Sequence, residues 1–306
     1  MIIFQIIYSK RFSNLKNKNR MSAVIKKFLK YFLIALISAL ILKSFFVDAF
    51  KIPSASMENT LLTGDYIFIN KAYYSISTPH YIVLLNLWLP SYPLIKFKTP
   101  KRNDIIVFKF PGYPGEVIPS ENVSYIKRVI GLPGDTVQII NGLVYINGRR
   151  IPQPENAIFS SSIINKEQAA DEKIFPGNKD WTNNNYGPVI VPEKGQKVHL
   201  TPYNIAEWEI LIDREFGYKA VSVEGSVITI DRKPVRDYIV KKNYYFVLGD
   251  NREDSLDSRY WGFVADDLVI GKAVFIYWSW DSSKQINNFT DIVKHIRFNR
   301  IFKIIN

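Results

Sequence analysis

Two serines stand two residues apart in the stretch PSASM, Ser54 and Ser56, shortly after a long apolar run. A serine hydroxyl attacks a carbonyl carbon only when a base removes its proton. The three histidines of the chain are His80, His199 and His295, and none lies in the turn-rich, charged setting that a Ser/His/Asp triad requires. The sequence therefore favours serine chemistry with a base other than histidine.

Lys127 is the best candidate for that base. It lies in SYIKRVIGL, a strand-like segment in which alternation sends Lys127 and Arg128 to opposite faces. A lysine acts as a base only when it is neutral, so burial must lower its pKa from about 10.4 to about 7, at a cost of about 4 kcal/mol. Most lysines in strands extend to solvent instead, which is the alternative here. We expect Lys127 to be buried and Arg128 to stay solvated.

A third polar segment, LGDNREDSLDSRYWGF, lies between two strand-like runs. Its carboxylates, guanidinium groups and hydroxyls must bond one another or face solvent. A calcium-binding loop is the alternative interpretation. It fails because Ser255 replaces the glycine of the sixth position of such a loop and Trp261 replaces the bidentate glutamate of the twelfth. We therefore predict no metal site in this segment.

Four segments resemble, in this order, the sequence boxes of bacterial type I signal peptidase, also called leader peptidase: PSASM with TLLTGDY, NDIIVF, YIKRVIGLPGD and GDNREDSLDSRYWGF. Four boxes in order are far more specific than one. The resemblance implies a membrane-bound serine endopeptidase with a Ser/Lys dyad. Such an enzyme removes signal peptides from exported preproteins through an acyl-enzyme, without a metal or an organic cofactor.

The family's catalytic residues can be carried over by position. Ser56 matches the nucleophile and Lys127 the general base. Ser54 matches the residue whose hydroxyl joins the backbone N–H of Ser56 in the oxyanion hole, which stabilises the tetrahedral intermediate. Ser255 matches the serine that orients the lysine amine.

The resemblance also implies supporting and substrate-binding residues. Asp257 and Arg259 match a structural ion pair beneath the site, and Asp250 is expected to shape the same loop. The shallow subsites, which accept small residues at the first and third places before the cut, fall on Phe50, Ile52, Met57, Leu61, Tyr125 and Ile126. The chain departs from the family pattern at Ala55, Asn59 and Asn103, where we expect altered loop stiffness.

The basic residues are unevenly placed, although the net charge is +12. Residues 1–30 contain no acidic residue and carry Lys10, Arg11, Lys16, Lys18, Arg20, Lys26, Lys27 and Lys30. Residues 28–47 form an apolar run with the length of a membrane-spanning helix. Positive charge before the run predicts a cytoplasmic N-terminus and an exported domain beyond the span, rather than nucleic-acid binding. A cleaved signal peptide is the alternative interpretation of the run.

These observations predict a single-pass protein of the bacterial inner membrane, with its catalytic domain on the periplasmic side. Its expected partners are signal peptides of preproteins, the lipid bilayer and the nearby translocation machinery, with no nucleic acid. The chain has no cysteine, so its fold must rest on core burial without disulfides. The sequence leaves open whether translation starts at Met1 or at Met21.

Beyond the anchor, short runs rich in Ile, Val, Tyr and Phe alternate with turns and predict a mainly β fold of antiparallel, barrel-like strands. Asn141 and Gly142 between VQII and LVYI predict a hairpin turn. The division of the chain is predicted as a cytoplasmic tail at 1–27, the anchor at 28–47, a catalytic β domain at 48–150 and 218–306, and an inserted α+β cap at 151–217.

Two segments leave alternatives open. Residues 81–97 are apolar and aromatic but broken by prolines, and form either a buried hairpin or a loop that dips into the outer leaflet. The tail KHIRFNRIFKIIN forms either a solvated helix or a membrane-surface contact.

Rival functions also stay open. The chain could be a specialised peptidase that matures one partner such as a pilin, a self-cleaving Ser/Lys protein of related fold, or an inactive anchored scaffold that binds peptides. The presence of Ser56, Lys127 and Ser255 together weighs against the scaffold.

Overall fold

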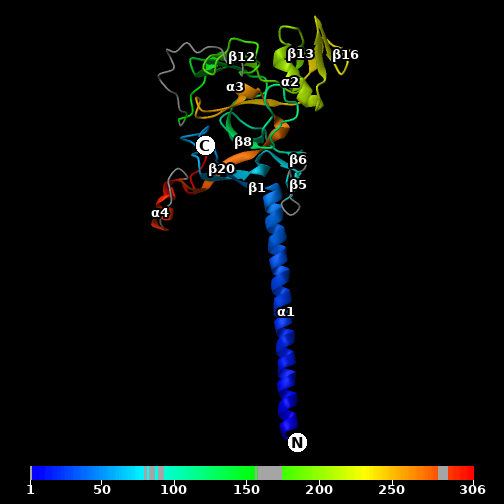
Figure 1. Cartoon of the computed structure of the whole chain (residues 1–306), viewed down its shortest axis with the longest axis vertical. Helices are drawn as coiled ribbons and strands as arrows, with labels where there is room; N and C mark the ends of the chain where they lie inside the picture. The colour runs from blue at the N-terminus through cyan, green and yellow to red at the C-terminus, as the bar shows by residue number, and fades with distance from the viewer. Residues whose placement is uncertain are drawn as a thin grey trace.

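The computed structural model describes residues 2–78, 81–82, 87–88, 93–155, 157, 174–281 and 289–306. One long helix, α1 (Ile2–Phe45), projects from a globular part built mainly of strands (Figure 1). Among the described residues, its stretch Val24–Phe45 is the one helix long and apolar enough to cross a membrane, and no other part of the protein buries it. The helix ends two residues before the expected end of the span, because Val47 begins the first strand.

The larger sheet contains seven antiparallel strands in the order β1-β2-β20-β7-β8-β18-β19. Their bounds are β1 (Val47–Lys51), β2 (Asp65–Asn70), β7 (Ile105–Lys109), β8 (Ser124–Gly131), β18 (Tyr244–Leu248), β19 (Val264–Ala265) and β20 (Val269–Ser279). The pairings of β20 with β2 and with β7 contain register shifts, which increase local twist and help the sheet to curl. The predicted mainly β, antiparallel fold is confirmed.

Side chains cover both faces of this sheet. On β7, Ile105 and Val107 belong to one buried cluster, whereas Ile106 and Phe108 belong to another, as strand alternation requires. The first cluster is completed by Ile52, Met57, Leu61, Ile67, Ile69, Ala273, Ile276 and Ile305. The sheet is therefore the rigid layer that carries the loops between its strands.

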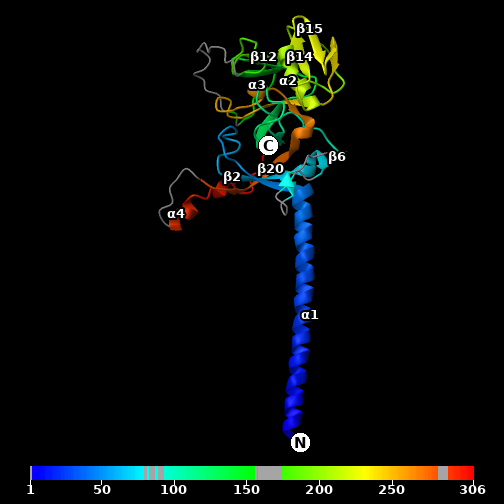
Figure 2. The ribbon, with the colours of Figure 1, turned by 45° about the vertical axis from the view of Figure 1, so that its right-hand side comes forward.

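Smaller sheets and one helix form the end of the molecule farthest from α1 (Figures 1 and 2). The smaller sheets have the orders β11-β10-β9-β12, β14-β15-β16 and β13-β17. Their strands are β9 (Thr136–Ile140), β10 (Leu143–Ile146), β11 (Arg149–Arg150), β12 (Tyr186–Ile190), β13 (Lys197–His199), β14 (Val221–Glu224), β15 (Val227–Ile230), β16 (Lys233–Pro234) and β17 (Asp237–Ile239). Asn141 and Gly142 join β9 to β10 with positive φ angles of 50° and 76°, as the hairpin prediction requires.

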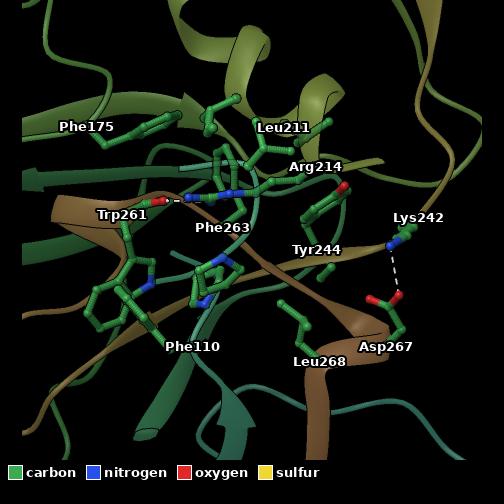
Figure 3. A pocket seen from close by; sticks show the side chains of 15 residues that line it. Phe110, Phe175, Leu211, Arg214, Lys242, Tyr244, Trp261, Phe263, Asp267 and Leu268 are labelled. Carbon is green, nitrogen blue, oxygen red and sulfur yellow. Dashed lines mark hydrogen bonds and ion pairs between the residues drawn. The ribbon is translucent and has the colours of Figure 1, made fainter. Parts of the chain in front are cut away.

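Helix α2 (Ile205–Phe216) packs between these sheets and the larger one. It buries Trp208, Leu211 and Ile212 on one face, and it ends at Gly217, whose left-handed φ of 79° closes the last turn. Figure 3 shows Leu211 and Arg214 of α2 on one side of a cavity, with Tyr244 and Phe263 across from them.

The smaller sheets extend beyond the cap expected at 151–217. Strands β9 to β11, within residues 136–150, pair among themselves and with β12. Strands β14 to β16 pair among themselves, and β17 pairs with β13. None of these strands joins the larger sheet. The division into domains stays a prediction, and the strand pairing favours a cap that runs from 136 to 239. The sequence did not predict β1, β12 or β13, because the first was counted with the anchor and the others lie in polar, turn-rich surroundings.

The remaining elements are short. They are β3 (Ser75–Ser77), β4 (Tyr81–Ile82), β5 (Leu87–Trp88), β6 (Pro93–Lys96), α3 (Ser258–Trp261), α4 (Phe289–Lys294) and the 3₁₀ turns η1 (Lys71–Tyr73), η4 (Asp266–Leu268) and η5 (Phe298–Arg300). Within residues 81–97, β4 pairs with β5, and β6 pairs with β3. Leu94, Ile95 and Phe97 are all more than half exposed, so the buried-hairpin alternative does not hold for this described end of the segment.

The C-terminal segment is not a continuous solvated helix. After η5 the chain runs beside β20, where Phe302 N–H donates to Ile276 O and Ile305 N–H donates to Val274 O. Ile305 is buried in the core cluster next to the PSASM loop. Phe298, Phe302 and Ile304, in contrast, are 62%, 75% and 68% exposed.

Arg300 ties this segment to the loop between β1 and β2. Its guanidinium group contacts both carboxylate oxygens of Asp65, the shorter distance being 2.6 Å, and it donates to Thr60 O at 3.0 Å. Asp65 is fully buried and also accepts from the Ser279 hydroxyl. A buried carboxylate that loses its cationic partner is strongly destabilising.

We therefore predict that Arg300→Met lowers the free energy of unfolding by about 3–5 kcal/mol. Chemical denaturation of the full chain in detergent, followed by tryptophan fluorescence, measures this change. The matched control is Lys197→Met, which removes a cation from the solvent-exposed pair with Asp237 and should cost less than about 1 kcal/mol. Equal losses for the two variants would contradict the proposed importance of the buried pair.

Candidate active site

Ser56 lies in the loop between β1 and β2, next to the polar segment that follows β18. Asn251 fixes this stretch from the opposite side, because its backbone N–H donates to Ser56 O at 3.1 Å and its side-chain amide donates to Ala55 O at 3.2 Å. The next side chain, Met57, is fully buried in the core cluster. Ser56 itself is 8% exposed, so its hydroxyl is held at a defined place near the surface.

Lys127 of β8 reaches this hydroxyl. Its amine nitrogen Nζ lies 2.6 Å from Ser56 Oγ and 5.6 Å from the centre of the Tyr125 ring. The side chain is 2% exposed. Burial lowers the pKa of Lys127 to about 8, although the nearby carboxylate of Asp257 acts in the opposite direction. A substantial fraction of this amine is therefore neutral near neutral pH and able to take a proton.

Ser54 stands beside the nucleophile candidate, with its Oγ 3.4 Å from Ser56 Oγ. It is exposed, so its hydroxyl can turn toward a bound molecule. The backbone N–H of Ser56 forms no hydrogen bond within the described part of the chain. These two donors are the ones expected to form an oxyanion hole.

Ser255 is placed near the dyad but does not contact Lys127 as expected. Its hydroxyl has no hydrogen-bond partner among the described residues, and it lies directly over Gly249. A Cβ atom at Gly249 would stand 2.2 Å from Ser255 Oγ and 2.4 Å from Ser56 O. Only glycine allows the Ser56 and Ser255 segments to approach so closely. The orienting role of Ser255 stays a prediction.

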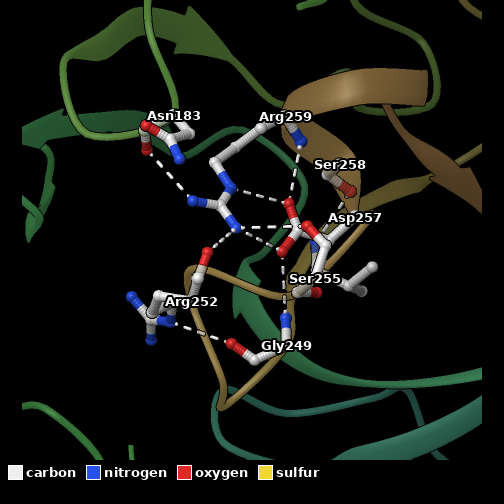
Figure 4. A network of polar contacts seen from close by, with 8 residues as sticks. Asn183, Gly249, Arg252, Ser255, Asp257, Ser258 and Arg259 are labelled. Carbon is white, nitrogen blue, oxygen red and sulfur yellow. Dashed lines mark hydrogen bonds and ion pairs between the residues drawn. The ribbon is translucent and has the colours of Figure 1, made fainter. Parts of the chain in front are cut away.

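Asp257 and Arg259 form the expected ion pair beneath the site (Figure 4). Arg259 Nε and Nη2 each donate to one carboxylate oxygen of Asp257 at 2.8 Å, and Gly249 N–H donates to the same carboxylate at 3.1 Å. Arg259 Nη2 also donates to Arg252 O at 2.7 Å. Burial alone would raise the pKa of Asp257, but the charge and hydrogen bonds of Arg259 outweigh it and hold that pKa below its ordinary value.

A second buried ion pair joins β8 to the loop after β18, and Thr60 connects it to the loop between β1 and β2, here called the nucleophile loop. Arg128 Nε and Nη2 donate to the two carboxylate oxygens of Asp250 at 2.8 and 2.7 Å, and the Thr60 hydroxyl donates to the same carboxylate at 2.6 Å. The expectation that Arg128 stays solvated is wrong, since it is 4% exposed. The curled sheet is covered on both faces, so both residues of the pair Lys127 and Arg128 are buried, and Arg128 is compensated by Asp250.

The expected subsite residues are divided between two buried clusters, one on each face of the larger sheet. Ile52, Met57 and Leu61 are buried in one cluster, against which Phe50 and Ile126 pack, while Tyr125 belongs to the cluster on the other face. Strand β8 pairs with β18 only from Arg128 to Gly131, whereas β7 pairs with all of Ser124 to Arg128. The Ser124–Lys127 part of β8 therefore has one unpaired edge next to the dyad among the described strands.

Sequence reasoning missed three residues that shape this site. Gly249 permits the close approach of two loops, Asn251 fixes the backbone of Ala55 and Ser56, and Thr60 links the nucleophile loop to Asp250. Gly249 and Asn251 lie within the quoted polar segment, but no local pattern reveals a contact 190 residues away. Among the described residues no cluster of acidic residues and histidines could hold a metal ion.

Two family departures are explained by the backbone. Asn59 and Asn103 have φ angles of 70° and 72°, in the left-handed region. Asparagine tolerates this region, and proline, whose φ is fixed near −65°, does not. The nucleophile loop therefore turns at Asn59 in a conformation that a proline could not adopt.

A family profile and several known proteins match this chain in sequence. The profile of the family described as "Signal peptidase, peptidase S26" matches residues 25–278. The chain is 34% identical to signal peptidase I of Buchnera aphidicola subsp. Schizaphis graminum over 80% of its own length and 72% of that protein. It is 31% identical to signal peptidase I of Pseudomonas aeruginosa, over 86% of the chain and 76% of that protein.

A third similar protein is matched over a larger share of its own length. The chain is 30% identical to signal peptidase I of Aquifex aeolicus, over 83% of the chain and 84% of that protein. The matched residues 25–278 include both serines of PSASM, the buried lysine and the polar segment of the site. The chain therefore belongs to the signal peptidase family, peptidase S26, and is a serine peptidase.

Proposed function

We propose that this protein cleaves signal peptides from exported preproteins, with Ser56 as nucleophile and Lys127 as general base. The observation that carries the proposal is the 2.6 Å contact between Ser56 Oγ and the buried amine of Lys127, whose pKa is lowered to about 8. The two histidines that the structure describes, His199 and His295, contact Asp237 and Trp280 rather than this pair, which supports lysine as the base. The relatives named above as signal peptidase I support the choice of substrate.

The reaction begins when neutral Lys127 takes the proton of the Ser56 hydroxyl. Ser56 Oγ then forms a bond to the carbonyl carbon of the scissile peptide, and the π electrons of the carbonyl move to its oxygen. The backbone N–H of Ser56 and the hydroxyl of Ser54 donate to this oxyanion. When the C–N bond breaks, protonated Lys127 gives its proton to the leaving amine, and an acyl-enzyme remains.

Hydrolysis of the acyl-enzyme uses the same groups. Neutral Lys127 takes a proton from a water molecule, whose oxygen bonds to the acyl carbon. The bond to Ser56 Oγ then breaks, and Lys127 returns the proton to the serine. We propose that Ser255 orients the lysine amine, and that the Asp257–Arg259 and Asp250–Arg128 pairs hold the loops in place.

Substrate binding is proposed at the unpaired edge of β8. An extended peptide added there would form backbone hydrogen bonds beside Lys127, as in β-strand addition. Its side chains would enter the shallow subsites lined by Phe50, Ile52, Met57, Leu61, Tyr125 and Ile126. Because Ile52, Met57 and Leu61 are already packed in the core, little space is left for large side chains.

The stretch Val24–Phe45 is proposed to anchor the enzyme, with the N-terminus in the cytoplasm and the catalytic domain outside. Cleavage after the run, as for a signal peptide, would remove or cut β1, which pairs with β2 over five residues of the catalytic sheet. The chain passes from Phe45 to Ser56 in eleven residues, so the nucleophile stays near the bilayer surface, where translocated signal peptides emerge.

The end of the globular part from which α1 projects is proposed to touch the lipid. Both views place β6 and α4 at this end (Figures 1 and 2). The exposed side chains there include Leu94, Ile95, Phe97, Phe298, Phe302 and Ile304. Exposed apolar and aromatic groups beside a membrane span favour insertion at the interface.

The first test is cleavage of a purified preprotein with an Ala-x-Ala site, in detergent, by the wild type and by Ser56→Ala. We expect a cut after that site by the wild type alone, because the variant lacks the attacking oxygen. The N-terminus of the product is sequenced. No cut by either protein on several precursors, with both folded, would count against a general signal peptidase and favour the specialised maturase.

The second prediction concerns pH. With a Lys127 pKa of about 8, kcat/KM should rise with pH and level off above it, because only the neutral amine is a base. At pH 6 the neutral fraction is about one hundredth, so kcat/KM should be about 100-fold below the plateau. Lys194→Ala, at an exposed lysine of the cap, should keep this profile. A flat profile between pH 6 and 9 would exclude Lys127 as the base.

The third prediction concerns Gly249. Gly249→Ala should lower kcat at least about 100-fold, since its methyl group would push apart the Ser56 and Ser255 segments and disturb the oriented dyad. Gly148→Ala is the control, because that glycine has open space around it and lies in the turn between β10 and β11, outside the larger sheet. Because Gly148 has a positive φ, its alanine variant should be less stable, but the kcat of that variant should be unchanged. Full activity in folded Gly249→Ala would refute the crowding argument.

A further inference from the structure

A cavity of about 130 Å³ lies between α2 and the larger sheet, away from the Ser56 hydroxyl (Figure 3). We call it the α2 cavity. Its walls are largely apolar and include Phe110, Phe175, Leu211, Phe263 and Leu268. An apolar cavity of about 150 Å³ in another protein holds a benzene ring. The α2 cavity therefore has room for one ring or a short branched chain.

One wall of the cavity carries a half-buried cation, Arg214 of α2. Its guanidinium group donates to Gly112 O at 2.8 Å, Tyr113 O at 2.9 Å and Glu116 O at 3.1 Å. Burial lowers the pKa of Arg214 to about 10, with a small opposing effect from Tyr244. In the described part of the chain no carboxylate forms an ion pair with it, and its charge is balanced by these carbonyl dipoles and by the charge of Glu116, which also opposes the lowering of its pKa.

A second polar group belongs to the same wall. Trp261 is 1% exposed, and its indole N–H has no acceptor among the described residues. The backbone oxygen of Trp261 accepts a long bond of 3.4 Å from Arg214 Nη1, drawn as a dashed line in Figure 3. A buried donor without a partner is costly unless something supplies an acceptor.

The other charges of the lining neutralise each other. Lys242 Nζ lies 2.8 Å from Asp267 Oδ2, and both side chains are about one third exposed. Asp267 is the one carboxylate among the lining residues, and it is engaged by this lysine. The polar groups that remain for a ligand are therefore hydrogen-bond donors, the indole N–H of Trp261 and the cationic guanidinium group of Arg214.

We propose that the α2 cavity binds a small apolar carboxylate, such as a monoaromatic or short branched-chain acid. The apolar part would fill the space between Phe110, Phe263 and Leu268. The carboxylate would accept from the Trp261 indole N–H and lie against the Arg214 guanidinium group. A charge-assisted hydrogen bond in a low-dielectric site is stronger than a neutral one, which selects the acid over an uncharged molecule of the same shape.

The α2 cavity is separate from the proposed peptide-binding edge of β8, and the rings of Trp261 and Tyr125 lie between the cavity and Lys127. The Trp261 ring lies 5.2 Å from the Tyr125 ring, which in turn lies 5.6 Å from Lys127 Nζ. The proposed binding does not depend on the catalytic role of Lys127. It can be tested by a direct binding measurement, without any assay of cleavage.

The test uses the full chain in detergent, labelled with 5-fluorotryptophan and observed by fluorine NMR. The chain has six tryptophans, and Trp261→Phe assigns the resonance of interest. The probes are phenylacetate and phenylacetamide, which share a shape and differ in charge. We expect phenylacetate to shift the Trp261 resonance saturably, with a Kd on the order of 1 mM for so small a ligand. The amide should bind at least about tenfold more weakly.

Variants locate the binding. Arg214→Met removes the cation at similar size and should weaken phenylacetate at least about tenfold, while Arg236→Met, at an exposed arginine of the cap, should leave the Kd unchanged. Ala265→Leu, which fills the cavity, should abolish the shift. If Arg214→Met does not fold, the comparison of the two probes on the wild type still decides. No saturable shift, or equal affinity for acid and amide, would overturn the proposal.

Discussion

The structure depends on keeping one amine out of water. Lys127 can serve as a base only if its protonated form is disfavoured, and burial at 2% exposure does this while its Nζ remains 2.6 Å from Ser56 Oγ. Everything around the dyad has to tolerate that burial. A carboxylate in direct contact with Lys127 would stabilise the ammonium form and raise the pKa of the amine again. Two of the carboxylates nearest to it in charge effect, those of Asp257 and Asp250, are instead paired with arginines.

Two buried ion pairs achieve this engagement. Arg259 occupies both oxygens of Asp257, and Arg128 occupies both oxygens of Asp250. These pairs weaken the effect of the two carboxylates on Lys127, and burial still lowers its pKa. Buried pairs add little net stability, but breaking one by removal of a partner is expensive. They therefore define the geometry of the loops more than they strengthen the fold. The same principle applies to Asp65 and Arg300, which hold the far end of the nucleophile loop.

The curled sheet explains how distant segments meet. Strand β8 supplies Lys127, the β1–β2 loop supplies Ser56, and the loop after β18 supplies Gly249 and Ser255. Only because Gly249 lacks a Cβ atom can the last two loops touch. The cap adds a further layer over the sheet, where α2 leaves a cavity lined by one half-buried cation and one indole whose N–H has no partner among the described residues. Helix α1 continues almost directly into β1, which fixes the distance of Ser56 from the apolar stretch Val24–Phe45.

The sequence by itself determined what local patterns can encode. Alternating apolar residues and turn signals indicated the strands and the Asn141–Gly142 hairpin, the apolar run indicated the span, and four ordered segments indicated the family with its candidate Ser56 and Lys127. Only the tertiary structure decided which groups are buried and which pair. Strand alternation placed Arg128 in solvent, yet the sheet is covered on both faces and Asp250, 122 residues away, compensates its charge. Likewise, the roles of Gly249, Asn251 and Arg300 arise from contacts between loops far apart in the chain. Their physical cause is close packing and charge compensation across the fold, which no local spacing records.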